Sequence, residues 1–226
     1  MKTLFNPLIV LAVTAIAFSS CMKDDNTDYE AQQREEEEAL VASLATDRTK
    51  IDTYLLANPP EGSGVWQEDE TEYPLTYIES PKRGIWYAIL SEPTEDDDEA
   101  YEYELNSQGG IVAPKVRVNY SVSLLNDDEP IQSKTNASID FATFGQTSPN
   151  VFNQIWIWSF IPKTMQYNTN DVEVGGLTAR GLKKGSKILV VTPSAWAFGG
   201  QAIEVESETI PANSPLVYEF EVLSIE

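Results

Sequence analysis

The sequence predicts an α+β protein, in which an N-terminal helical segment precedes an antiparallel sheet, and two observations support this fold class. Leu40, Leu44 and Ile51 recur at roughly helical spacing until residues 58–60, Asn-Pro-Pro, end the pattern. From residue 84 onward the chain consists of short runs rich in β-branched and aromatic residues, as expected of strands with one buried face.

Composition limits both the size of the protein and its partners. The 226 residues suffice for one domain, or for one domain with a small appendage. The 36 acidic and 15 basic residues give a net charge of −21, which disfavours nucleic acid and anionic membrane surfaces as partners. The sequence contains no histidine, the usual general base and the commonest transition-metal ligand. Residues 95–100 lack the spacing of a calcium loop, so we expect neither a metal nor a cofactor.

Residues 1–20 have the pattern of a signal peptide. The apolar run from residue 8 to residue 18 is shorter than the ~20 residues that span a bilayer as a helix. Cys21, the single cysteine, follows this run, and the arrangement resembles the lipobox of bacterial lipoproteins. The resemblance implies cleavage before Cys21 and lipidation of Cys21, which would anchor the protein to the outer membrane of the cell envelope. A buried or redox-active cysteine is the alternative.

The segment after Cys21 is expected to be a tether over residues 21–38. Residues 22–26, Met-Lys-Asp-Asp-Asn, resemble an export tag that moves lipoproteins to the cell surface, and they suit a polar tether equally well. Four consecutive glutamates at 35–38 indicate a flexible spacer that runs into a helix. Residues 39–83 are then expected to form a helical N-terminal extension, of one or two amphipathic helices, and a loop.

Runs typical of strands occur at 84–90, 115–125, 154–161, 186–192 and 216–225. Within the second run, Val116, Val118 and Tyr120 alternate with polar residues, which indicates a strand with one buried face. The acidic segment between the first two runs, from about residue 92 to residue 110, is expected to be a long, solvated and dispensable connection.

Three segments of residues 84–226 stand out: VRVNYSVSLL, GLKKGSKILVVTPSAWAFGG and above all the final IPANSPLVYEFEVLSIE. With these segments, residues 84–226 resemble the FKBP-type peptidyl-prolyl cis-trans isomerase domain. The resemblance implies an FKBP-like antiparallel sheet curled around a short helix, with insertions at about 92–110 and 146–174. The preceding helices and the lipid anchor also resemble the extended lipoprotein members of this family.

The implied reaction explains how a chain without histidine could be an enzyme. Rotation about an X-Pro bond needs no proton transfer, because its barrier of ~18–20 kcal/mol comes from lost amide resonance. An apolar pocket can accelerate it by binding the twisted amide better than the planar one. The implied partners are proline-containing polypeptide segments, and we expect a monomer that contacts the membrane only through its lipid.

The resemblance also implies the residues of the pocket. Tyr120 matches a pocket tyrosine, Ile210 an isoleucine whose backbone N–H holds the substrate carbonyl, and Tyr218 an aromatic position of the last strand. Phe198 stands where the family has a corner tyrosine, so the ring is kept and the hydroxyl is lost. The implied substrate-binding residues are Ile131, Gln132, Ile139, Phe141, Leu177 and Trp196, with Ile131 and Gln132 in place of a Phe-Asp pair.

The pocket floor and the activity stay open at the level of sequence. Leu177 falls near the floor position, but Trp156 or Trp158 from the insertion could fill it instead, although their alternation also suits a plain strand. Three hypotheses follow: an active isomerase or folding helper, a degenerate FKBP-like module that binds peptide or protein without turnover, and a purely structural surface lipoprotein. Phe198 and Gln132 favour the second hypothesis, whereas Tyr120 and Ile210 favour the first.

Overall fold

The computed structural model describes residues 26–62, 64–127, 129–143, 151–206 and 208–226. The predicted signal peptide, Cys21 and residues 22–25 of the tether lie outside these described residues. Among the described helices, none is both long enough and apolar enough to cross a membrane.

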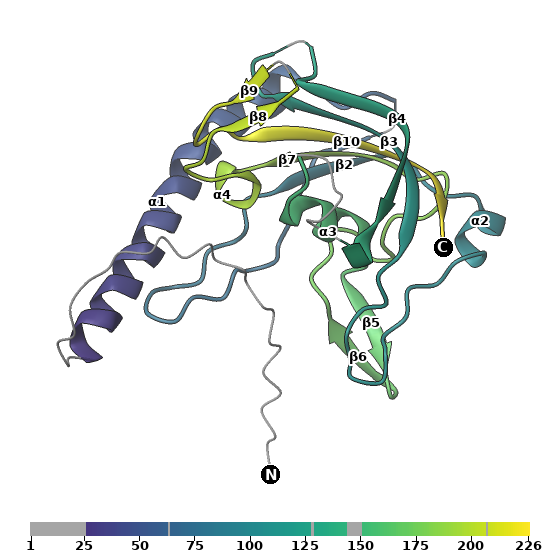
Figure 1. Cartoon of the computed structure of the whole chain (residues 1–226), viewed down its shortest axis with the longest axis horizontal. Helices are drawn as coiled ribbons and strands as arrows, with labels where there is room; N and C mark the ends of the chain where they lie inside the picture. Colours follow the sequence, from purple (N-terminus) through teal and green to yellow (C-terminus); the bar gives the residue numbers. More distant parts are fainter. Residues whose placement is uncertain (1–25, 63, 128, 144–150, 207) are drawn as a thin grey trace.

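The described strands confirm the predicted antiparallel sheet. Its six strands lie in the order β1-β2-β7-β10-β3-β4, and every neighbouring pair is antiparallel (Figure 1). The strands are β1 (Gln67–Glu68), β2 (Trp86–Ser91), β7 (Lys187–Thr192), β10 (Leu216–Ile225), β3 (Lys115–Leu124) and β4 (Gln132–Asp140). Four of the five runs predicted as strands are strands of this sheet.

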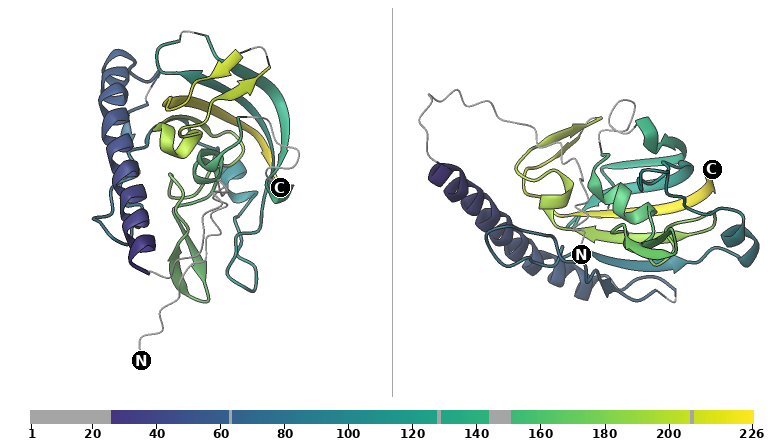
Figure 2. Two further views of the ribbon diagram at one scale, coloured as in Figure 1. Left: turned by 60° about the vertical axis from the view of Figure 1, so that its left-hand side comes forward. Right: turned by 90° about the horizontal axis from the view of Figure 1, so that it is seen from below.

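The alternation of side chains along β10 gives the sheet two buried faces. Leu216, Tyr218 and Phe220 belong to the main core, whereas Val217 between them packs with Ile51 in a second cluster. Helix α1 (Asn26–Ala57) contributes to that second cluster through its C-terminal half, and helix α3 (Gln154–Phe160) contributes to the main core. The curved sheet therefore lies between α1 and α3 (Figures 1 and 2).

Helix α1 corrects the predicted tether, because residues 26–38 belong to one helix that continues to Ala57. Buried positions at Leu44, Asp47 and Ile51 follow the helical period. Nearer its start, the Glu37 carboxylate accepts hydrogen bonds from the backbone N–H groups of Thr76, Tyr77 and Ile78 at 2.7–3.2 Å. The charged N-terminal half of α1 is thus attached to the loop that precedes β2.

The run at 154–161 was predicted as a strand, and this prediction is wrong. Asn153 caps a helix there, since its side-chain oxygen accepts a hydrogen bond from the Ile155 N–H at 3.0 Å. Ile155, Trp156, Ser159 and Phe160 are buried, at the i, i+1, i+4 and i+5 spacing of one helix face. The β propensity of Ile and Trp is outweighed because a helix presents this whole face to the main core.

Short elements complete the described chain (Figure 1). The hairpin of β5 (Thr164–Tyr167) and β6 (Asn170–Glu173) follows α3, and the hairpin of β8 (Ile203–Val205) and β9 (Glu208–Ile210) precedes β10. The short helices are α2 (Glu95–Glu99), α4 (Ser194–Ala197) and the 3-10 helix η1 (Phe141–Thr143).

The acidic segment that contains α2 is solvated as predicted, since no residue between 92 and 110 is buried, but it is also attached to the domain. Its being dispensable stays a prediction. Asp97 accepts a hydrogen bond from the Lys184 ammonium at 2.8 Å, and Asp98 pairs with Lys183 and Arg180. The Tyr103 hydroxyl donates to the Leu182 carbonyl at 2.7 Å. The basic turn before β7 therefore holds this segment.

Candidate functional site

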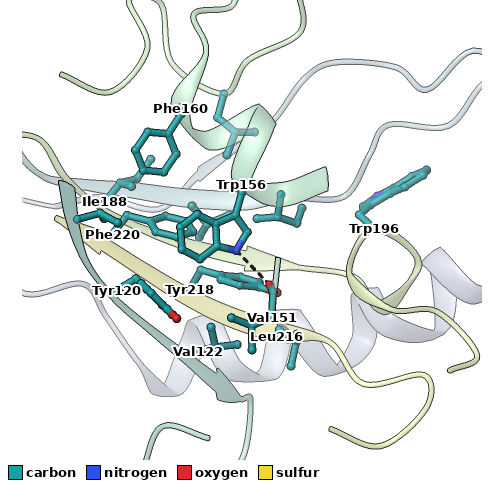
Figure 3. Close-up of a cluster of buried hydrophobic side chains, with 14 of the residues drawn as sticks. Tyr120, Val122, Val151, Trp156, Phe160, Ile188, Trp196, Leu216, Tyr218 and Phe220 are labelled. Carbon is teal, nitrogen blue, oxygen red and sulfur yellow. Dashed lines mark hydrogen bonds between the residues drawn. The ribbon is translucent and has the colours of Figure 1, made fainter. Parts of the chain in front are cut away.

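An aromatic cluster on the concave side of the sheet forms the candidate site. Trp156 projects from α3 toward the sheet, and its side chain is fully buried (Figure 3). Tyr120 of β3 and Phe220 of β10 contact the indole edge-on, with ring centroids 4.8 and 4.7 Å away. The indole N–H donates to the Val151 carbonyl at 3.1 Å, which fixes the orientation of the ring.

Tyr120 supplies the polar end of this cluster. Its hydroxyl donates to the side-chain oxygen of Gln132 on β4 at 2.9 Å, so these two of the implied pocket residues lie together. Desolvation by burial, and secondarily the negative charge of Glu206, raise the pKa of Tyr120 to about 12. The phenol therefore stays protonated and acts as a hydrogen-bond donor at neutral pH.

A charged pair borders the same end of the site. Glu206, at the turn of the β8–β9 hairpin, accepts a hydrogen bond from Lys134 at 2.5 Å and a longer one from the Gln132 amide at 3.5 Å. The hydrogen bond from Lys134 and its positive charge hold the pKa of the Glu206 carboxyl below its usual value. The hairpin is thus linked to β4 beside Tyr120.

Tyr218 and Ile210 occupy buried positions. Tyr218 is fully buried, and its hydroxyl accepts a hydrogen bond from the Asn153 side-chain nitrogen at 2.6 Å. Burial raises the pKa of Tyr218 far above the usual range of a phenol. The Ile210 side chain, on β9, is 1% exposed and belongs to the main core. Through its hydrogen bond with Asn153, Tyr218 orients the start of α3. A role for the Ile210 backbone stays a prediction.

The corner formed by residues 194–199 carries Trp196 and Phe198 in different surroundings. Phe198 is half-buried and packs against the main core. The Trp196 indole donates to the Arg83 carbonyl at 2.6 Å and packs against Tyr73 and Trp158, with centroids 4.6 and 5.6 Å away. Figure 3 shows Trp196 apart from Trp156, and its ring contacts both Tyr73 of the N-terminal extension and Trp158 of α3.

Trp156 and Leu177, two of the residues suggested for the pocket floor, are both buried in the main core, and the assignment of a floor stays a prediction. Leu177 is buried after the β5–β6 hairpin, and its backbone N–H donates to the Trp158 carbonyl at 2.8 Å. Ile131 and Ile139 are buried in the main core, and Phe141 lies 5.2 Å from Phe160 between ring centroids.

Sequence reasoning missed Phe152, Phe160 and Phe220. Phe220 could have been found, because it follows Tyr218 by two residues and therefore shares its face of β10. Phe152 is half-buried, and its ring stacks on the Trp156 indole at 4.3 Å and 20°. With Phe152 in this position, the Trp156 side chain has no exposed surface.

The arrangement is a closely packed aromatic cluster with the hydrogen-bonded side chains of Tyr120 and Gln132 at one end. Within the described ranges, no group of three or more His, Cys, Asp or Glu side chains could hold a metal ion. The residues assembled at the cluster do not include a nucleophile paired with a base.

No family model matches this chain, and no curated protein matches it. Among solved structures, it is similar to a peptidyl-prolyl cis-trans isomerase from Pseudomonas syringae pv. tomato str. DC3000, at 19% identity and a TM-score of 0.41, covering 82% of this chain and 94% of that chain. AtFKBP13 is 15% identical, with a TM-score of 0.40 and coverage of 62% and 92%. The structure of the three FKBP domains of wheat FKBP73 is 18% identical, with a TM-score of 0.36, and the match covers 63% of this chain and 44% of that chain.

Proposed function

We propose that the protein is an FKBP-type peptidyl-prolyl cis-trans isomerase, a folding helper that acts on proline-containing polypeptide segments. One observation carries the proposal: Tyr120 and Phe220 contact the edges of the buried Trp156, and Tyr120 is oriented by its hydrogen bond to Gln132. A proline ring needs an apolar aromatic surface of this kind, and the Tyr120 hydroxyl would donate to the adjoining carbonyl by turning away from Gln132.

The chemistry follows from the apolar character of the site. Twisting the X-Pro bond removes amide resonance and makes the amide less dipolar, so a water-poor aromatic site can bind the twisted form better than the planar form. An acceleration of 10⁴ requires about 5.5 kcal/mol of such preference. No proton has to move between the protein and the peptide.

A second candidate function is peptide or protein binding without turnover, and two observations favour it. The ring of Phe152 covers the Trp156 indole, so a proline ring reaches that floor only after Phe152 moves. Phe198 lacks a hydroxyl donor at the corner, and such donors contribute a few kcal/mol where they strengthen in the transition state. Both observations predict that turnover is slow.

A protease-coupled assay on a Leu-Pro-Phe peptide separates the two candidates. We expect weak but measurable turnover by the full-length chain, and an increase of about tenfold or more in kcat/KM for Phe198→Tyr, because the substitution adds the missing donor. Peptide binding without turnover in both proteins would establish the binding module. If NMR titration with the peptide shifts no resonance near Tyr120 or Phe198, both candidates are wrong.

The same proposal includes anchoring to the outer membrane of a bacterial cell envelope, with the protein facing the periplasm or the cell surface. The support is the signal-like run of residues 1–20 and Cys21 directly after it. Four residues, 22–25, separate Cys21 from the start of α1 at Asn26. Lipidation at Cys21 would therefore hold the N-terminal end of α1 close to the membrane.

A further inference from the structure

We infer that Asp47 of helix α1 is a positioning residue for the corner at 194–199, and so for Phe198 at the proposed site. The inference rests on the proposed function and extends it to the N-terminal helix, which lies outside the region resembling an isomerase domain. It is carried by hydrogen bonds at both ends of the corner, all of which lead back to one turn of α1.

The start of the corner is fixed by a buried carboxylate. Asp47 is 2% exposed, and its Oδ2 accepts two hydrogen bonds from Ser194, one from the backbone N–H at 2.8 Å and one from the hydroxyl at 2.5 Å. Ser194 itself is fully buried. Hydrogen bonds to a charged group are stronger than neutral ones, and two donors from one residue restrict its rotation as well as its position.

Ser194 transmits this restraint to the aromatic residue. Its carbonyl accepts the N–H of Phe198, which ends α4, and also the N–H of Gly199 at 2.7 Å. The backbone N–H and the hydroxyl of Ser194 thus bind α1, and its carbonyl binds the end of the corner. A shift of Ser194 must displace Phe198, because only one turn of helix separates them.

The end of the corner is connected to the same turn of α1. The Gly199 carbonyl accepts the Asn213 N–H at 2.7 Å, and the Asn213 carbonyl lies 3.5 Å from the Lys50 ammonium. Lys50 in turn donates to Asp47 Oδ1 at 2.9 Å. Asp47 and Lys50 thus reach both ends of a segment that lies far away in the sequence.

If Asp47 and Ser194 served only to stabilise the fold, an apolar pair of similar volume would do so equally well. The reason is that burying a carboxylate carries a desolvation cost, which its hydrogen-bond partners only offset. The carboxylate differs from such a pair in directing Ser194 to one orientation. The structure therefore assigns Asp47 to the geometry of the corner, and its loss should be visible at Phe198 and in peptide binding.

The test compares Asp47→Asn with Asp52→Asn, the same change one turn later on α1, at an aspartate whose side chain is 50% exposed. Each full-length variant is examined by NMR at the backbone amides of residues 197–199 and at the Trp196 indole, and its Kd for a Leu-Pro-Phe peptide is measured. We expect Asp47→Asn to shift these resonances and to weaken binding about tenfold, with no such effect from Asp52→Asn.

Ser194→Ala keeps the inference testable if Asp47→Asn does not fold. It removes only the hydroxyl donor, and we expect smaller shifts in the same amides and about threefold weaker binding. Unshifted resonances at 197–199 in the folded variants would overturn the role of Asp47, whatever the activity. Shifted resonances in a protein that does not bind the peptide would support the positioning and overturn the proposed function instead.

Discussion

At the residue scale, Phe152 is one of the aromatic side chains that cover Trp156. Its ring stacks on Trp156 at 4.3 Å, and together with the surrounding core it leaves the indole without exposed surface. Phe152→Ala should open the indole and strengthen Leu-Pro-Phe binding several-fold in calorimetry, because the peptide no longer has to displace a stacked ring. Tyr101→Ala, which truncates a half-buried ring at the acidic segment, is the control and should leave Kd unchanged. Weaker binding by Phe152→Ala would show that Phe152 is part of the binding surface.

A second prediction at this scale concerns the ionisation of Tyr120. Its pKa is raised to about 12 by burial and by Glu206, whereas an unfolded tyrosine titrates near about 10. The stabilisation due to this residue is therefore complete below about pH 10 and is lost as the pH rises through about 12. Ring carbon signals of labelled tyrosine should show Tyr120 still protonated at about pH 11. Ionisation of Tyr120 near pH 10 in the folded protein would contradict the buried hydrogen bond to Gln132.

The sequence named Tyr120 and Gln132 as separate pocket residues, and the hydrogen bond between them was not predicted. For the pocket floor it offered Leu177, or Trp156 or Trp158 from the insertion, and this choice stays a prediction. The structure has α3 at Gln154–Phe160, within the predicted insertion, and the β5–β6 hairpin after it. The hydrogen bond from Trp196 to Arg83 could not be predicted, because it joins the corner to a segment without a recognisable pattern.

Helix α3 shows why an alternating aromatic pattern does not determine an element. Trp156 and Trp158 are two residues apart and suit a strand, but the cap at Asn153 and the spacing from Ile155 to Phe160 suit a helix equally well. The packing of residues 154–160 against the neighbouring core decides between a strand and a helix. The hydroxyl of Tyr218, which contacts the Asn153 side chain, belongs to that environment.

At the scale of this element, Asn153→Ala should destabilise the protein by about 2–4 kcal/mol. It removes the helix cap, at about 1 kcal/mol, and leaves the buried Tyr218 hydroxyl without its close donor, at about 1–3 kcal/mol. The measurement is urea unfolding of the single and double variants. Adding Tyr218→Phe to Asn153→Ala should recover part of the loss, because the unpaired hydroxyl is removed with it. Fully additive losses would contradict the proposed coupling of β10 to α3.

At the scale of the whole molecule, the class of fold was predictable because the pattern changes sharply near residue 84. The antiparallel sheet and the helical extension both follow from that change. The way in which the extension closes the second face of the sheet was not predictable, since Ile51 meets Val191 and Val217 across more than 100 residues of chain. The composition of the acidic segment predicted its exposure, but not its ion pairs with Lys183 and Lys184, which are distant in the sequence.

Anchoring is tested on the whole chain in a Gram-negative host. Cys21→Ser should abolish incorporation of labelled fatty acid and release the protein from the membrane fraction or leave it unprocessed, because the residue that would carry the lipid is lost. The folded domain should be unaffected, with the same unfolding midpoint as the wild type. Membrane retention without any acyl group on the wild-type protein would overturn the lipoprotein proposal.

The central claim is that the aromatic cluster around Trp156 binds the proline of a polypeptide. Its most direct test is a search for NMR contacts between the proline ring protons of a bound Leu-Pro-Phe peptide and protein side chains. We expect contacts to the rings of Tyr120 and Phe198. A peptide that binds with its proline contacts confined to other surfaces, such as the acidic segment or the exposed face of α1, would contradict it.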